Sequence, residues 1–95
     1  MVLLSDVEVN RALGELSGWT KDGNTIRKQF TFESFPKAVE FVNRLVPEAE
    51  AADHHPDLHI NYRRVTVVYS THSEGGITQK DVAGAGMAEQ KAAGV

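Results

Sequence analysis

The stretch DHHPDLHINYRRVTVVYSTH, residues 53–72, decides the fold because it predicts two consecutive strands. Apolar and polar residues alternate over 58–62, and again over 65–71, which is the period of a strand with one buried face. The short link at 63–64 predicts a tight turn and antiparallel pairing. The strand ends opposite that turn then lie side by side, and this is where the sequence places His54, His55 and His72.

A long helix is predicted before this strand pair. Ser34 can cap it, Pro36 is tolerated in its first turn, and one apolar stripe follows at helical spacing: Ala38, Val42, Leu45, Ala49 and Ala52. Pro47 lies inside this pattern, so we expect a kink or two helical segments end to end. Pro56 disfavours helical geometry at His55, which predicts that the helix ends near His54 and His55.

The two ends of the chain complete the pattern. SDVE at 5–8 reads as a capping box before a first helix, and DGN at 22–24 is a turn signal between two further strands. TQKD at 78–81 can cap a last helix, rich in alanine and glycine. The order α-β-β-α-β-β-α predicts an α+β fold in two layers: a four-stranded antiparallel sheet with helices packed on one face, in a single domain over residues 1–95.

Composition narrows the function classes. The chain has 95 residues, 41% of them hydrophobic and 24% charged, with a net charge of −3, and no basic stripe beyond Arg63 and Arg64. We therefore expect an ordinary folded domain that binds no nucleic acid directly. The absence of cysteine excludes disulfides and thiolate chemistry. MVLLSDVEVN lacks the pattern of a signal peptide and no run is long enough to span a membrane, so we expect a cytoplasmic protein.

The histidine cluster suggests proton transfer. Glu50 and His54 are four residues apart at the end of the predicted helix, so they share a face and can touch. A carboxylate beside an imidazole fixes its tautomer, and Asp53 adds a second carboxylate. Imidazoles donate and accept protons near pH 7, so general acid–base catalysis fits these residues. His59 lies on the polar side of its strand and is expected at the surface.

Other interpretations remain open from the residues alone. His54 and His55 can simply end a helix, Glu50 can be a solvated charge, and Asp81 can be only a cap. The histidines and carboxylates are numerous enough for a zinc site, but no helical His-x-x-x-His pair is present. A serine or threonine near His72 could act as a nucleophile, although no recognisable motif surrounds it.

The segment EAADHHPDLHINYRRVTVVYSTHSEGGITQKD, residues 50–81, resembles the pterin-4a-carbinolamine dehydratase family. The upstream LSGWT and FTFESFPKAVEFVNRL are also similar to that family, so the resemblance covers nearly the whole chain. It implies dehydration of a 4a-hydroxytetrahydropterin to a quinonoid dihydropterin, without a metal or bound cofactor. The substrate would come from an aromatic amino acid hydroxylase, in tetrahydrobiopterin recycling.

The resemblance also implies roles for particular residues. His54, His55 and His72 match the three active-site histidines, and Glu50 and Asp81 match supporting acidic positions. Pterin contacts are implied for Asp53 and Pro56 in one strip, and for Thr71, Ser73 and Glu74 in another. His54 and His72 are hypothesised as the acid–base pair, with His55 holding the pterin. Leu58 stands where some members have an aromatic residue.

Assembly and partners follow from the same resemblance. Members of the family form dimers or tetramers, so a homodimer or homotetramer is expected. In animals the family doubles as a dimerisation cofactor of a homeodomain transcription factor, and other relatives assist a carboxylating enzyme. A non-catalytic coactivator or assembly factor is therefore the alternative function. The complete set of Glu50, His54, His55, His72 and Asp81 favours the enzyme.

Overall fold

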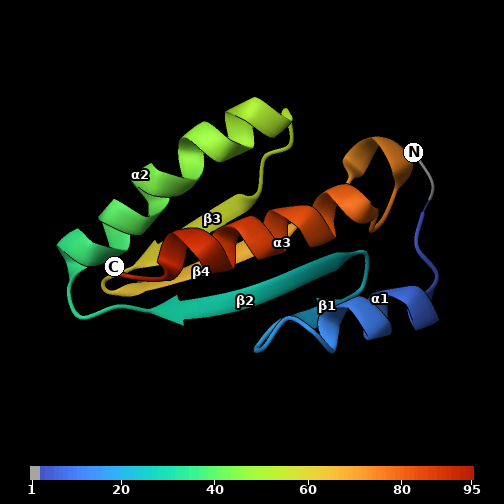
Figure 1. Cartoon of the computed structure of the whole chain (residues 1–95), viewed down its shortest axis with the longest axis horizontal. Coiled ribbons are helices and arrows are strands. Elements are labelled where there is room, and N and C mark those ends of the chain that lie inside the picture. Colours follow the sequence, from blue (N-terminus) through green and yellow to red (C-terminus); the bar gives the residue numbers. More distant parts are fainter. Residues whose placement is uncertain (1–2) are drawn as a thin grey trace.

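The computed structural model describes residues 3–95, and its centre is a four-stranded antiparallel sheet in the order β1-β2-β4-β3 (Figure 1). The predicted order of helices and strands is confirmed, with one short 3₁₀ turn added after β4. The elements are α1 (Asp6–Leu13), β1 (Thr20–Asp22), β2 (Thr25–Thr31), α2 (Phe35–Ala52), β3 (Asp57–Asn61), β4 (Arg64–Tyr69), η1 (His72–Glu74) and α3 (Gln79–Ala92).

The first strand pair turns where the sequence predicts, and the second turns one residue earlier than predicted. Asp22 pairs with Thr25 around Gly23, whose φ is 60°, and Asn61 pairs with Arg64 in the second hairpin. Tyr62 was expected on the strand, but it lies in this turn with a φ of 55°, in the left-handed region. A two-residue hairpin turn needs such a conformation to match the twist of its strands. The two long strands β2 and β4 pair at the centre of the sheet.

The helix ends follow the predicted capping chemistry. In α1 the Glu8 amide donates to Ser5 Oγ at 3.2 Å, and the Ser5 amide donates to Glu8 Oε1 at 2.9 Å. In α3 the same reciprocal box joins Thr78 and Asp81. Of the two alternatives expected at Pro47, two separate segments are wrong, because α2 is continuous from Phe35 to Ala52. Pro47 and Asn43 are both exposed, so water can satisfy the carbonyl that loses its helical donor.

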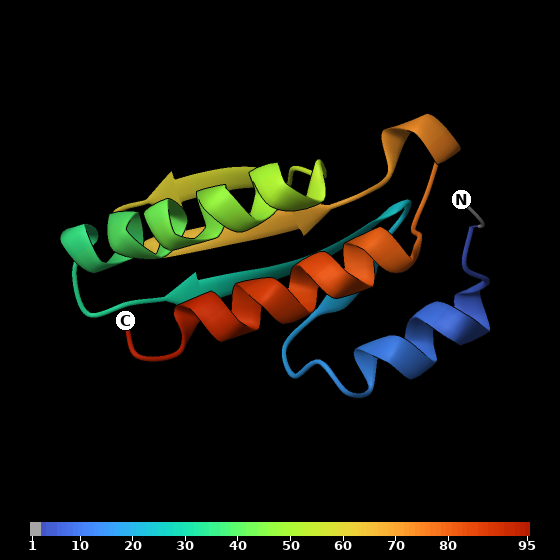
Figure 2. The same ribbon diagram turned by 45° about the horizontal axis from the view of Figure 1, so that its top comes forward.

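The core lies between the sheet and the two long helices. Figure 2 shows α2 and α3 running in opposite directions over the same face of the sheet. Phe41 and Leu45 from α2 and Ala85 and Ala88 from α3 are almost fully buried. They meet the inward residues of the two central strands: Ile26, Phe30, Val65, Val67 and Tyr69. This packing fixes the distance between α2 and α3, and hence the space between them.

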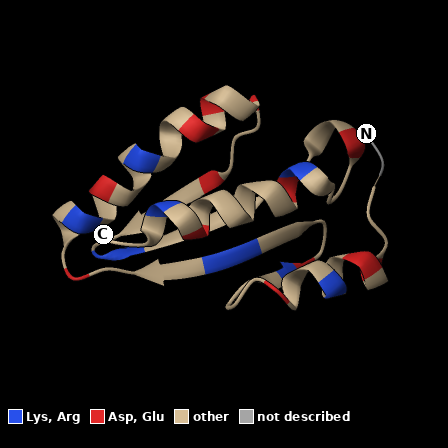
Figure 3. Ribbon diagram, viewed as in Figure 1, with Lys and Arg blue, Asp and Glu red and all other residues tan. Residues whose placement is uncertain are grey.

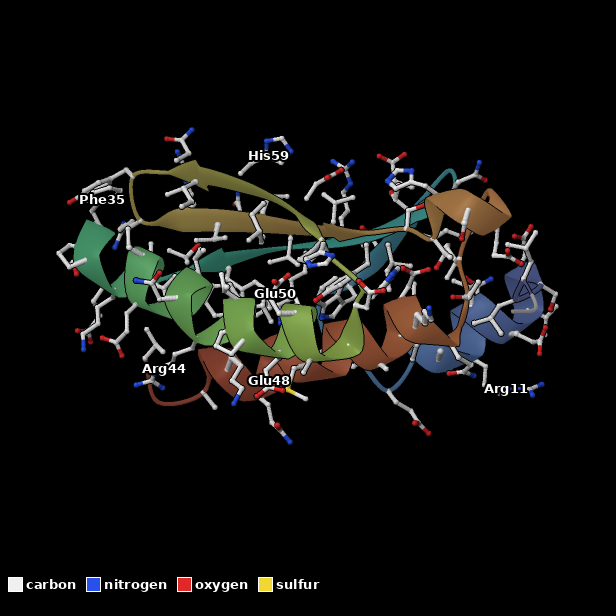
Figure 4. The ribbon with its side chains drawn as sticks, turned by 90° about the horizontal axis from the view of Figure 1, so that it is seen from above. Arg11, Phe35, Arg44, Glu48, Glu50 and His59 are labelled. Carbon is white, nitrogen blue, oxygen red and sulfur yellow. The ribbon has the colours of Figure 1, made fainter. Side chains whose placement is uncertain are left out.

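Charged side chains are spread over the remaining surface. Lysines and arginines are interspersed with aspartates and glutamates, while α3 carries no charge between Asp81 and Glu89 (Figure 3). His59 lies on the face of the sheet away from the helices (Figure 4) and is exposed. Among residues 3–95, no helix has the length and hydropathy needed to cross a membrane.

Candidate active site

The link between α2 and β3, residues 54–56, carries two adjacent histidines. α2 ends at Ala52, and Asp53 takes left-handed angles with a φ of 50°. The His54 amide then donates to the carbonyl of Ala49 at 3.1 Å, which closes the helix end. The helix thus stops shortly before the predicted end near His54 and His55. Beyond the turn, the two imidazoles bond to carboxylates on different helices.

His54 bonds to a buried carboxylate of α3. Its Nε2 lies 2.6 Å from Oδ1 of Asp81, whose side chain is 0% exposed, and the His54 side chain itself is only 12% exposed. The second carboxylate oxygen, Oδ2, accepts from the Thr71 hydroxyl at 2.8 Å and from the Thr78 amide at 2.9 Å. Asp81 therefore caps α3, as the local sequence predicts, and also holds an imidazole from a link 27 residues earlier.

This arrangement fixes the protonation pattern of the network. Thr71 Oγ1 gives its hydrogen to Asp81, so the Thr78 hydroxyl, 2.8 Å away, must donate to Thr71. A carboxylate that accepts from two other donors is an acceptor for His54 as well, which assigns the neutral His54 hydrogen to Nε2. Nδ1 is then the nitrogen of His54 that is free to take a proton.

His55 pairs with Glu50 on the outside of α2. His55 Nε2 bonds to Glu50 Oε2, and the two side chains are 54% and 68% exposed. The sequence predicted that Glu50 would touch His54, and this was wrong. The left-handed turn at Asp53 ends the helical register, so the residue five positions after Glu50 reaches it instead of the residue four positions after. An ion pair this exposed contributes little to stability.

Tyr69 lies against the imidazole of His54. The two rings are stacked, with centroids 5.8 Å apart and an interplanar angle of 20°. Burial, followed by the negative charge of Asp81, raises the pKa of Tyr69 to about 12. The phenol therefore stays neutral over the range in which histidine changes its charge.

The raised pKa of Tyr69 predicts a loss of stability in base. The unfolded chain releases this proton near the ordinary value of 10.0, whereas the folded chain holds it to about 12. The free energy of unfolding should therefore fall as the pH rises through this window, and less steeply in Tyr69→Phe. Denaturant titrations of both proteins across the window measure the difference. A constant difference between them would contradict a raised pKa.

A groove of about 310 Å³ opens between α2 and α3 beside His54. Its walls are mainly small or apolar side chains, and His54, Tyr69, Lys80 and Glu48 supply its polar groups. The full lining is Glu48, Ala49, Ala51, Ala52, His54, Tyr69, Lys80, Ala83, Gly84 and Met87. The volume is at the lower end for small-molecule sites, and apolar walls with few polar groups are typical of them. A planar heterocycle would meet an imidazole whose Nε2 is already bonded.

Comparison with known proteins then identifies the family. The family model described as pterin 4 alpha carbinolamine dehydratase matches residues 2–91. The chain belongs to the pterin-4a-carbinolamine dehydratase family. A Mycobacteroides abscessus protein provisionally named pterin-4-alpha-carbinolamine dehydratase is 51% identical, over 87% of this chain and 88% of its own. A Roseiflexus protein with the same provisional name is 54% identical, over 82% of this chain and 84% of its own.

Solved structures of similar fold include two different kinds of protein. A Brucella melitensis protein described as a transcriptional coactivator/pterin dehydratase superposes with a TM-score of 0.93 at 36% identity, covering 96% of this chain and 99% of that one. A pterin dehydratase-like RuBisCO assembly factor of the alpha-carboxysome has a TM-score of 0.65 at 18% identity, covering 81% and 89%. The second likeness concerns the fold alone.

Of the predicted site residues, His54 is in the lining of the groove, and Thr71 and Asp81 are joined to it by hydrogen bonds. The lining contains neither His55 nor His72. Thr71 is buried and bonded to Asp81, whereas His72 and Ser73 follow it in η1 and are exposed. Of the other predicted residues, Asp53 is exposed, and Pro56 and Glu74 are half-buried. In residues 3–95, no group of three or more histidine and acidic side chains is placed to hold a metal ion.

Among the groove residues that the sequence did not predict are Tyr69 and Lys80. Tyr69 has the parity of the buried face of β4 and was expected only as a strand residue. Lys80 lies within the capping segment of α3, where nothing distinguished it from a solvated charge. The signal for both is their place beside predicted site residues, since Tyr69 is two positions before Thr71 and Lys80 directly precedes Asp81.

Proposed function

We propose that the protein dehydrates a 4a-hydroxytetrahydropterin to the quinonoid dihydropterin by histidine general acid–base catalysis, in the recycling of tetrahydrobiopterin. The observation that carries the proposal is the bond between His54 and the buried Asp81 at one wall of the groove. The three donors offset the cost of burying this carboxylate, and the network holds an imidazole at the groove wall. Membership of the dehydratase family supports the choice of a pterin substrate.

The chemistry requires two proton movements and no redox step. The C4a–O bond breaks, the departing hydroxyl takes a proton and leaves as water, and N5–H gives up its proton as the C4a–N5 double bond forms. Neutral His54 can accept a proton at Nδ1 while Nε2–H remains bonded to Asp81, whose charge stabilises the resulting imidazolium. A second imidazole of opposite protonation must supply the other proton.

The remaining roles are assigned from this starting point. His72 completes the acid–base pair with His54, and His55, oriented by Glu50, holds the pterin. Thr71 and Asp81 act through His54, because both are buried and occupied by hydrogen bonds inside the protein. Asp53, Pro56, Ser73 and Glu74 contribute the rim around the substrate.

The direct test is a dehydratase assay. Purified protein added to a phenylalanine hydroxylase reaction should accelerate the decay of the 4a-carbinolamine absorbance in proportion to its concentration. The same protein heated past its unfolding transition is the control. A decay rate that does not change with added native protein would contradict the proposal and favour the non-catalytic alternative.

The non-catalytic alternative is a coactivator or an assembly factor, and two solved structures of similar fold indicate what each would be. The names of the two structural neighbours include a transcriptional coactivator and an assembly factor. For either function, the assembly proposed is a homodimer or homotetramer in the cytoplasm. Acceleration of the decay establishes the enzyme whatever the assembly, so the two classes are separated by a single measurement.

A further inference from the structure

Tyr69 is enclosed on several sides by the residues around the site. It is the last residue of β4 and is 2% exposed. The Tyr69 ring is stacked with the imidazole of His54, and their centroids are 5.8 Å apart. The centroid of the Trp19 ring lies 6.3 Å from that of Tyr69, with an interplanar angle of 39°. The ring therefore connects the hydrophobic core to the residue that we propose as a proton-transfer group.

The absence of a side chain at Gly84 leaves room for the Tyr69 ring. A Cβ atom at position 84 would lie 2.5 Å from Cε1 and 2.6 Å from Cζ of Tyr69, closer than any real contact. The ring thus lies directly on the backbone of α3. Glycine inside a helix lowers its intrinsic stability, so this close approach is a physical reason for glycine here. Gly86, two residues on, has nothing within 4 Å of the same hypothetical atom.

These contacts restrain His54 in two independent ways. Asp81 fixes Nε2 and therefore one edge of the imidazole, but a single hydrogen bond still permits the ring to rotate about it. The stacked Tyr69 ring restricts that rotation, because it holds the plane of the imidazole within 20° of its own. Both rings line the groove, so the restraint determines how the free Nδ1 meets a ligand.

We propose that Tyr69, resting on Gly84, is a positioning residue that fixes the plane of the His54 imidazole. The inference rests on the proposed dehydratase function for its catalytic consequence. It assigns the effect to the aromatic ring of Tyr69 and not to its hydroxyl. The packing of Tyr69 against Gly84 therefore belongs to the site, although neither residue is titrated during the reaction.

Four variants distinguish the contributions of the Tyr69 ring, its hydroxyl, the packing of the ring on Gly84, and the replacement of any glycine in α3. Tyr69→Leu removes the ring, Tyr69→Phe removes only the hydroxyl, Gly84→Ala displaces the ring, and Gly86→Ala adds the same methyl group where there is space. Each is measured by the proton NMR resonances of the His54 imidazole, by kcat and KM for the dehydration, and by thermal unfolding.

Tyr69→Leu and Gly84→Ala should each change the NOE contacts of the His54 imidazole protons with their neighbours, because the imidazole can then turn about its bond to Asp81. A shift of the His54 resonances alone does not count, since loss of a nearby ring current produces one without any movement. Both variants should also lower kcat by up to about 10²-fold with a smaller change in KM, since a catalytic group is misplaced. Gly86→Ala should keep kcat within about twofold of the wild type, well short of the loss expected from misplacement. Tyr69→Phe retains the ring and should keep the wild-type NOE contacts of His54. If Tyr69→Leu fails to fold, Gly84→Ala carries the test.

The inference and the proposed function fail differently. Folded Tyr69→Leu or Gly84→Ala with unchanged NOE contacts of His54 and unchanged kcat would overturn the inference, and so would the same change of these contacts in Tyr69→Phe. A wild-type protein without dehydratase activity would overturn the proposed function alone. The NMR comparison would then still decide whether Tyr69 positions His54.

Discussion

His54→Ala should lower the rate of carbinolamine dehydration by roughly 10² to 10⁴-fold, the range for loss of a positioned general acid or base. The expectation is large because His54 is the histidine that combines a buried carboxylate partner, a free nitrogen and a place in the groove. The imidazole is 12% exposed, stacks on Tyr69 and bonds to Asp81, so the variant is first checked for its fold by circular dichroism. The measurement is the steady-state rate at saturating and at low substrate.

Two matched substitutions give this result its meaning. His59→Ala removes the same side chain on the far face of the sheet and should leave the rate unchanged (Figure 4). His72→Ala should lose activity on a similar scale, since it is proposed as the second member of the acid–base pair. Full activity in both His54→Ala and His72→Ala would show that the acid–base assignment is wrong.

Asp81→Ala should lower the free energy of unfolding by about 3 kcal/mol or more, because a buried donor left without its acceptor costs about 1–3 kcal/mol. Three donors would lose their acceptor inside the protein: the Thr71 hydroxyl, the Thr78 amide and His54 Nε2. Each unsatisfied group adds a desolvation penalty, and the α3 cap is lost with them. A domain of this size has little margin for such a loss. Urea titration followed by circular dichroism measures it.

Asp81→Asn and Asp57→Ala complete that experiment. Asparagine can keep an oxygen where Thr71 and Thr78 donate but then turns its amide group toward His54 Nε2, so it should destabilise less than alanine and still more than a surface change. Asp57 is an exposed aspartate of β3, and its replacement should change stability by no more than about 0.5 kcal/mol. Equal effects of Asp81→Ala and Asp57→Ala would contradict the network described here.

The sequence predicted those parts of the fold that depend on local chemistry. Alternation defined β3 and β4, the two capping boxes defined the starts of α1 and α3, and the DGN turn defined the first hairpin. The prediction for Tyr62 was wrong because turn geometry outweighed the alternation of the strand. Pro47 did not break α2 because it lies on the exposed side, where water can take the place of the missing donor.

The sequence named candidate site residues but did not predict which of them contact one another. Which carboxylate reaches which histidine depends on one left-handed residue, Asp53, and on the docking of α3, neither of which a local pattern encodes. The packing of Tyr69 against Gly84 joins positions 15 residues apart, on a strand and a helix. From the sequence, the small residues of this helix indicated weak intrinsic stability and close approach of a neighbouring backbone, but not that a tyrosine ring lies on Gly84.

Titration with an unreactive dihydropterin, one without a C4a hydroxyl to lose, tests the central claim most directly. The side-chain NMR signals of the four histidines can be followed together in the native protein. The account predicts that the signals of His54, His55 and His72 shift in a saturable way with a single affinity, while His59 serves as an internal control and does not move. Saturable binding that leaves the His54 signals unchanged, or no binding at all, would contradict it.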